Sequence, residues 1–158
     1  MIDQGSARYL VAEIIPHCAA NRADWMAGRH LAEKVAEIRR WHVQDRGWRD
    51  IGDHWVIDRD GALAPGRPET VIGAHVEGHN RGTIGIGLLG GHGAAAEDAI
   101  EKNFTAAQGE AVRRLIAAIK GRTAIRKVSG HNDHAAKACL GFRVGKARVA
   151  LEMASGMD

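Results

Sequence analysis

The sequence predicts an α/β (α+β) fold in which a central mixed β-sheet is flanked by helices. Two apolar runs, at residues 9–15 and 83–91, have the length and composition of buried strands. Two further segments, at 28–45 and 105–121, repeat their apolar residues at helical spacing. Because strands and helices alternate along the chain, a sheet covered by helices is expected. The length of 158 residues is that of one domain, so we expect a single domain over 1–158.

The first half of the chain is expected to form a strand, a helix and a hairpin. The run YLVAEII at 9–15 is apolar and partly β-branched, and Pro16 is expected to stop it. Asp24 is a candidate cap for the amphipathic helix over 28–45. The segment HWVID at 54–58 predicts a short strand, and the RDG that follows predicts a hairpin turn of the Asp-Gly kind.

The second half begins with the run TIGIGLLGG at 83–91, in which glycines alternate with large apolar residues. That alternation is typical of a central strand with another group pressed close on one face. Residues 92–103 are polar and alanine-rich, which predicts a loop. Thr105 and Gln108 form a capping box for the second helix, which is expected to end near Gly121.

The most unusual segment is GHNDHAAKACLGF at 130–142, which has no apolar run of its own to bury. It collects four side chains of the metal-binding or proton-transfer kind: His131, His134, Lys137 and Cys139. A predicted strand at 123–129 ends just before it, and a terminal helix is predicted over 141–153. We therefore expect a loop with a chemical role at the end of the last strand.

Composition and charge exclude several classes of function. The formal net charge is only +3 and the basic residues are scattered apart from the pair Arg39 and Arg40, so no nucleic-acid partner is expected. No stretch approaches the ~20 apolar residues of a membrane span, so no membrane insertion is expected. The N-terminal segment lacks the cationic start and long apolar core of a signal peptide, which predicts a cytoplasmic protein.

The candidate metal site combines the loop with the first strand. A catalytic zinc site uses three protein ligands and leaves a fourth position for water. His131 and Cys139 lie eight residues apart on the loop, far enough for it to fold back on one ion. His17 is the best third ligand, because neighbouring parallel strands would bring His17 and His131 to the same edge of the sheet. Cys18 would then point to the opposite face, as a buried small residue.

Five motifs in order carry a family resemblance from about residue 9 to residue 142: IIPHCAAN, IRRWHVQDRGWRDIGDHWVIDRDG, GAHVEGHNRGTIGIGLLGG, FTAAQ and GHNDHAAKAC. The chain resembles the type-2 N-acetylmuramoyl-L-alanine amidase and peptidoglycan recognition protein family, and most of all its short phage endolysin branch, the T-seven lysozyme type. The resemblance implies a mixed sheet with flanking helices and a zinc site at the edge of the sheet.

The resemblance also implies roles for particular residues. The family's zinc ligands fall on His17, His131 and Cys139, and its catalytic lysine falls on Lys137. Its substrate-binding groove is lined at the positions of His75 and Asn80. Among the tryptophans, Trp48 is the candidate for stacking on a sugar, an expectation that does not come from the resemblance.

One position departs from the family pattern. The phage enzymes carry a catalytic tyrosine after the glycine of their D-[IV]-G motif, and Asp53 stands there in this chain. An ionised aspartate accepts hydrogen bonds but cannot donate one as a tyrosine does. We expect Asp53 to orient or deprotonate the zinc-bound water. The alternative is that Asp53 is a tolerated loop residue in a slow enzyme or in a chain that only binds.

The implied function is that of a Zn²⁺-dependent peptidoglycan hydrolase, which cuts the amide between N-acetylmuramic acid and L-alanine. Two alternatives stay open: a non-catalytic peptidoglycan-binding module and a cytoplasmic muropeptide-recycling amidase. An endolysin without a signal peptide would reach the cell wall through a holin or a similar release. RNA polymerase inhibition occurs in the family but depends on a particular partner, and we do not infer it for this chain.

Overall fold

The computed structural model of the chain describes residues 1–19, 21–92 and 100–130. The terminal helix predicted over 141–153 lies outside these residues. No helix among the described residues is long and apolar enough to cross a membrane.

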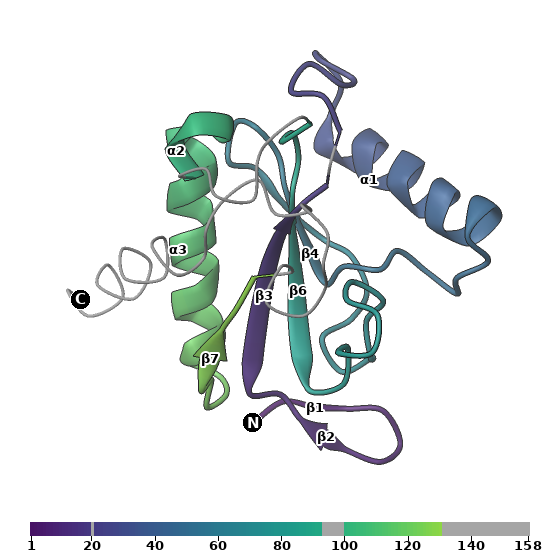
Figure 1. Ribbon diagram of the computed structural model, residues 1–158, viewed down its shortest axis with the longest axis vertical. Helices are drawn as coiled ribbons and strands as arrows, with labels where there is room; N and C mark the ends of the chain where they lie inside the picture. The colour runs from purple at the N-terminus through teal and green to yellow at the C-terminus, as the bar shows by residue number, and fades with distance from the viewer. Residues whose placement is uncertain (20, 93–99, 131–158) are drawn as a thin grey trace.

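A mixed five-stranded sheet forms the centre of the fold (Figure 1). Its strands, in spatial order, are β5 (Leu63–Pro65), β4 (Trp55–Ile57), β6 (Thr83–Leu88), β3 (Glu13–Cys18) and β7 (Lys127–Val128). β3 runs parallel to both β6 and β7, β4 runs parallel to β6, and β5 closes an antiparallel hairpin with β4. The predicted α/β class, mixed sheet and hairpin are confirmed. β3 and β7 are parallel neighbours, which is the condition for His17 and His131 to emerge at the same edge of the sheet.

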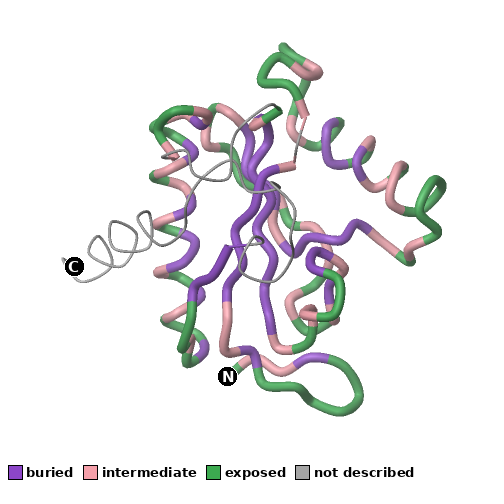
Figure 2. The backbone as a smooth tube through the Cα atoms, in the orientation of Figure 1, coloured by how far each residue is buried: buried purple, intermediate pink, exposed green. Residues whose placement is uncertain are grey.

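Two helices cover opposite faces of the sheet (Figure 1). α3 (Ala106–Lys120) packs its apolar stripe on one face, and α1 (Leu31–Arg40) packs on the other. The larger core, under α3, includes Ile14, Ile57, Ile84, Ile86, Leu88, Val112, Ile116 and Ile119. Figure 2 shows the central strands buried and the outer surface of α3 exposed. The face under α1 is the one that carries the polar site.

α3 begins and ends where the sequence predicts. The Thr105 hydroxyl accepts a hydrogen bond from the Gln108 N–H, and the Gln108 side chain accepts one from the Thr105 N–H, which completes the capping box. Gly121 follows the last helical residue. The loop predicted over 92–103 is wrong in part, because a short helix, α2, forms at Ile100–Asn103.

The helix predicted over 28–45 is in two parts. α1 begins at Leu31 after His30, and no side chain among the described residues caps it, so the assignment of Asp24 as its cap is wrong. The chain then continues as one wider π-helical segment, η1 (Trp41–Asp45). Such wide turns recur at functional sites, and η1 lines the cleft described below.

The first predicted strand also differs from the structure. Residues 9–15 divide between β2 (Tyr9–Leu10), which pairs with β1 (Asp3–Gln4), and β3, which continues through Pro16. The carbonyl of Ile14 points toward β7, where it accepts from the Ser129 N–H at 3.0 Å, so Pro16 faces the same side. Pro16 therefore withholds no N–H from the ladder with β6, and it does not end the strand. β7 is shorter than the strand predicted over 123–129.

Candidate active site

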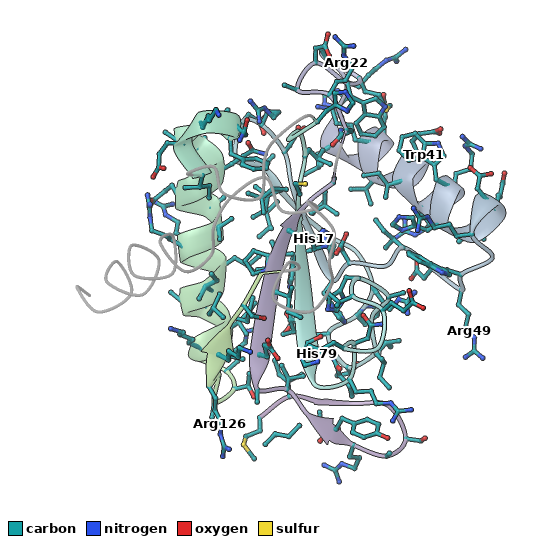
Figure 3. All side chains as sticks on the ribbon, in the orientation of Figure 1. His17, Arg22, Trp41, Arg49, His79 and Arg126 are labelled. Carbon is teal, nitrogen blue, oxygen red and sulfur yellow. The ribbon has the colours of Figure 1, made fainter. Side chains whose placement is uncertain are left out.

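The site begins with the alternation of side chains along β3. Ile14 and Cys18 enter the core under α3, whereas His17 lies on the other face, at the carboxyl end of the strand (Figure 3). Cys18 is 4% exposed, which confirms it as a buried small residue on the face opposite His17. His17 is therefore presented to the groove side of the sheet.

The neighbouring strand β6 leaves room for this site through two glycines. A side chain at Gly87 would lie 2.9 Å from the Asp53 Oδ2 atom, and one at Gly85 would lie 2.5 Å from the His75 ring. The glycine-laced run thus has polar groups pressed against one face, as the sequence predicts. Because β6 lacks side chains at these points, Asp53 and His75 can lie directly on the sheet beside His17.

The His17 side chain contacts the Asp53 carboxylate through its Nε2 atom. Its Nδ1 atom lies 3.2 Å from the Cys18 carbonyl oxygen, which can only accept a hydrogen bond, so the ring proton is on Nδ1. In the neutral imidazole, Nε2 then turns a lone pair toward a carboxylate oxygen. Two acceptors would then face each other, so a proton shared between them is required for this close contact.

The Asp53 carboxyl is buried, with 7% of the residue exposed. Burial by itself raises the pKa of Asp53, but the charge and hydrogen bond of a protonated His17 hold that pKa below its usual range. Asp53 is therefore an ionised acceptor at neutral pH.

His75 lies beside this pair, with its ring 6.4 Å from the His17 ring and nearly parallel to it. Its Nε2 atom lies 2.8 Å from the Thr83 hydroxyl, which itself donates to the Asn80 carbonyl, so His75 donates from Nε2. Burial lowers the pKa of His75 to about 3, which keeps the ring neutral. Its Nδ1 atom is buried and has no hydrogen-bond partner among the described residues.

Asn80 shapes the loop that carries His75. Its Oδ1 atom accepts hydrogen bonds from the N–H groups of His75 and Val76, at 2.9 Å each. The carbonyl end of this side chain is therefore used inside the loop. The expected roles of His75 and Asn80 in substrate binding stay predictions.

A cleft of about 440 Å³ opens over His17, Asp53 and His75. The segment from η1 to Trp48 forms its outer wall, with lining residues Trp41, His42, Asp45, Arg46 and Trp48. The Trp48 ring packs on the His42 ring at 4.7 Å and under the Arg46 guanidinium at 5.2 Å. The predicted sugar-stacking tryptophan thus lines the same cleft as His17. Arg46 also lines the cleft and was not predicted as a site residue, although it lies within the second of the five family motifs.

Two further histidines near the site hold backbone groups. His42 accepts the Gly52 N–H on Nδ1 at 3.0 Å, and burial lowers its pKa. His54 accepts the Gly85 N–H on Nδ1 and donates from Nε2 to the Val71 carbonyl at 2.8 Å, and burial lowers its pKa too. Both fix the backbone on either side of Asp53.

The remaining predicted site residues, His131, Lys137 and Cys139, lie outside the described residues. Within 1–19, 21–92 and 100–130, no group of three metal-binding side chains is present. Ser129, two residues before His131, is hydrogen-bonded through its N–H to the carbonyl of Ile14 in β3. The chain therefore leaves the described region beside the strand that carries His17.

Comparison with known proteins gives one family and several relatives. The family model described as N-acetylmuramoyl-L-alanine amidase matches residues 5–142. The chain is 37% identical to the endolysin of Klebsiella phage KP32 over 139 residues, 88% of this chain and 86% of that one. It is 35% identical to the endolysin of Escherichia phage T7 over 129 residues, 82% of this chain and 80% of that one.

Among solved structures, a mutant of Drosophila PGRP-LB in complex with tracheal cytotoxin has a similar fold. The TM-score is 0.73 at 24% sequence identity, covering 92% of this chain and 86% of that one. At this identity the likeness concerns the fold alone.

Proposed function

The chain belongs to the N-acetylmuramoyl-L-alanine amidase family, and on that premise we propose that it is a zinc-dependent, endolysin-like hydrolase of peptidoglycan. The bond cut is the amide between N-acetylmuramic acid and L-alanine. The observation that carries the proposal is the convergence of His17 Nε2 and the Asp53 carboxylate at the floor of a cleft large enough for a substrate. The working unit is a single zinc amidase domain over 1–158.

The residues present fit a zinc ion. A metal-binding histidine usually donates its other ring N–H to a carbonyl or carboxylate, as His17 donates to the Cys18 carbonyl. The lone pair on its Nε2 faces an anionic oxygen, which is the electrostatic setting that a cation requires. His131 and Cys139 are the other proposed ligands. When bound, the zinc ion polarises the scissile carbonyl and lowers the pKa of the attacking water to about 7.

The protein's own side chains carry the remaining steps. Asp53, held ionised, accepts a hydrogen bond or the proton from the attacking water. Lys137 donates to the oxyanion of the tetrahedral intermediate, and such a donor is worth roughly 3 to 4 kcal/mol in other acyl-transfer sites. His75 stays neutral, so it adds no positive charge beside the site.

The cleft wall supports a sugar-peptide substrate. Trp41 and Trp48 present aromatic surface to the cleft, and Trp48 is the residue proposed to stack on the sugar. His75 lines the cleft on a loop that Asn80 holds, and the stem peptide is proposed to lie along that loop. Peptidoglycan is thus the proposed partner, with no role for nucleic acid or membrane insertion.

A non-catalytic peptidoglycan-binding module is the second candidate. The observation that favours it is Asp53 in place of the family's tyrosine, because an acceptor replaces a donor beside the site. A muropeptide-recycling amidase would share the chemistry but act on small soluble fragments. An endolysin acts on intact wall, which it reaches through a holin or a similar release.

The test is to incubate the purified protein with murein sacculi and, separately, with soluble muropeptides, and to measure products and bound metal. We expect new L-alanine amines from sacculi, no new reducing sugar ends, and about one zinc per chain. New reducing ends without amines would contradict amide cleavage. Binding to sacculi with neither product would establish the binding module, and cleavage of soluble muropeptides alone would establish the recycling enzyme.

A further inference from the structure

We propose that Glu13 is a positioning residue that fixes the loop carrying His75 and the segment preceding His131 relative to each other and to β3. The inference rests on the function proposed above. Glu13 is the first residue of β3 and lies on the same face as His17, four residues and two alternations away. Glu13 and His17 therefore lie at opposite ends of β3, both on the face that carries the cleft.

The Glu13 carboxylate joins two separate parts of the chain. Its Oε2 atom lies 2.7 Å from His79 Nε2, and its Oε1 atom accepts a hydrogen bond from the Ser129 hydroxyl. Lys127 Nζ lies 3.9 Å from Oε1. Only 13% of the Glu13 side chain is exposed, so these contacts are largely shielded from water.

Each contact leads to a segment that holds or precedes a proposed site residue. His79 precedes Asn80, whose Oδ1 atom holds the N–H of His75 and therefore the loop on the proposed peptide side. Figure 3 shows His79 toward the opposite end of the central strands from His17. Ser129 lies two residues before His131, a proposed zinc ligand. One carboxylate thus ties the substrate loop and the base of the zinc loop to the strand that carries His17.

A carboxylate suits this task because it offers two acceptor oxygens at a fixed separation. Ser129 uses one oxygen and His79 the other, so both segments are registered on the same rigid group. A glutamine keeps the size but has a single acceptor oxygen, so it can restore only part of the arrangement. Small displacements matter at such sites, since a 1 Å shift can cost about 100-fold in rate.

The experiment compares four variants, Glu13→Ala, Glu13→Gln, Ser129→Ala and His79→Ala, with Glu110→Ala as the matched control. Glu110 is an exposed glutamate of α3 that pairs with Arg113 and Arg114, away from the groove. For each variant the zinc dissociation constant is measured by chelator competition, kcat and KM are measured on murein, and thermal unfolding is recorded.

Glu13→Ala should weaken zinc binding about tenfold and raise KM, in line with the 10- to 100-fold effects of groups behind metal ligands. Ser129→Ala should weaken zinc binding with little change in KM, and His79→Ala should raise KM with zinc binding retained. Glu13→Gln should be intermediate. A Glu13→Ala protein with a lower Tm but unchanged zinc affinity and KM would show a merely structural role. If Glu13→Ala does not fold, the Ser129→Ala and His79→Ala variants provide the test.

Amide hydrogen exchange separates this inference from the proposed function. If the parent neither binds zinc nor cleaves murein, the proposed function has failed, but the positioning role is still measurable. Glu13→Ala should then speed exchange in both 73–82 and 127–130, whereas His79→Ala affects only the first segment and Ser129→Ala only the second. Exchange that changes in neither segment, or in both for each single variant, overturns the inference.

Discussion

The Nε2 atom of His17 and the carboxylate of Asp53 face each other at the carboxyl end of β3, acceptor against acceptor. The one N–H of the neutral His17 ring donates to the Cys18 carbonyl, so a second proton has to be shared between Nε2 and the carboxylate for this contact to form. In the proposed function, a zinc ion bound at Nε2 would replace that proton and leave the Asp53 carboxylate as an acceptor beside it.

Asp53 can be tested by replacing its charge while keeping its shape. If Asp53 acts on the attacking water, Asp53→Asn should lose activity by orders of magnitude with zinc still bound, because the amide is not a base. Metal analysis and the amine-release assay check both halves. An asparagine variant as active as the parent would rule out the base. An Asp53→Tyr variant that is markedly faster would instead indicate that the natural chain is an impaired enzyme.

Gly87 tests the position of Asp53 without touching its chemistry. In Gly87→Ala the new methyl group would lie 2.9 Å from Asp53 Oδ2, so the carboxylate has to move away from its place beside His17. We expect murein hydrolysis to fall about tenfold or more.

The control is Gly109→Ala in α3, where no described atom other than the adjacent residues and the backbone of the helix itself lies within 4 Å of the added group. That change should raise stability by about 0.5–1 kcal/mol and leave hydrolysis unchanged. Equal activity of the two alanine variants would mean that the exact place of Asp53 is unimportant.

Measurements of bound zinc should distinguish the proposed zinc ligands from the proposed oxyanion donor. His17→Ala and Cys139→Ala should abolish hydrolysis and sharply weaken zinc retention. Lys137→Ala should lower turnover by roughly 100-fold or more while zinc content and unfolding stay close to those of the parent. Stoichiometric zinc with full activity in Cys139→Ala would show that the ligand set is wrong.

Much of the fold could be predicted from local patterns. The capping box at Thr105 and the apolar stripe after it define α3, and the Asp-Gly turn defines the β4–β5 hairpin, because each signal lies within a few residues. The prediction that Pro16 ends the strand was wrong, because the effect of a proline depends on which side of the strand its missing N–H faces. That side is decided by pairing with β6 and β7, which are distant in sequence.

Less of the candidate site could be predicted from the sequence, because its contacts also join residues that are distant along the chain. His17 and Asp53 were identified separately, yet their direct contact depends on Gly87 leaving space in β6. The link from Glu13 to Ser129 and His79 spans 116 and 66 residues, and only the register of the sheet brings these side chains together. No apolar periodicity in the sequence predicts the wide turn of η1.

Acid should destabilise the protein through His75. Burial lowers its pKa from 6.5 to about 3, so between these values the unfolded chain binds a proton that the folded chain does not. The contribution of the neutral His75 ring to the free energy of unfolding is therefore fully present above about pH 6.5. It falls by about 1.4 kcal/mol per pH unit as the pH drops toward 3. Urea unfolding from pH 7 to 4 measures the slope. His75→Gln should reduce it by about that amount, whereas the exposed His30→Gln should not; an unchanged slope in His75→Gln would contradict the assignment.

The last prediction concerns how α1 is held over the sheet. Lys34 Nζ lies 3.0 and 2.9 Å from the two carboxylate oxygens of Asp58, and both side chains are less than 10% exposed. This pair ties α1, and through it the cleft wall of η1, to the end of β4. Removing one partner strands a buried charge, so Asp58→Ala should cost about 3–5 kcal/mol of unfolding free energy.

The double change Lys34→Met with Asp58→Leu removes both charges and fills the space, so most of that loss should be recovered. Denaturant unfolding of the two variants provides the comparison. The exposed pair of Glu110 with Arg114 is the control, because Glu110→Ala should cost no more than about 1 kcal/mol. A single variant as stable as the parent, or a double variant no better than the single one, would show that the buried charges do not determine how α1 is attached.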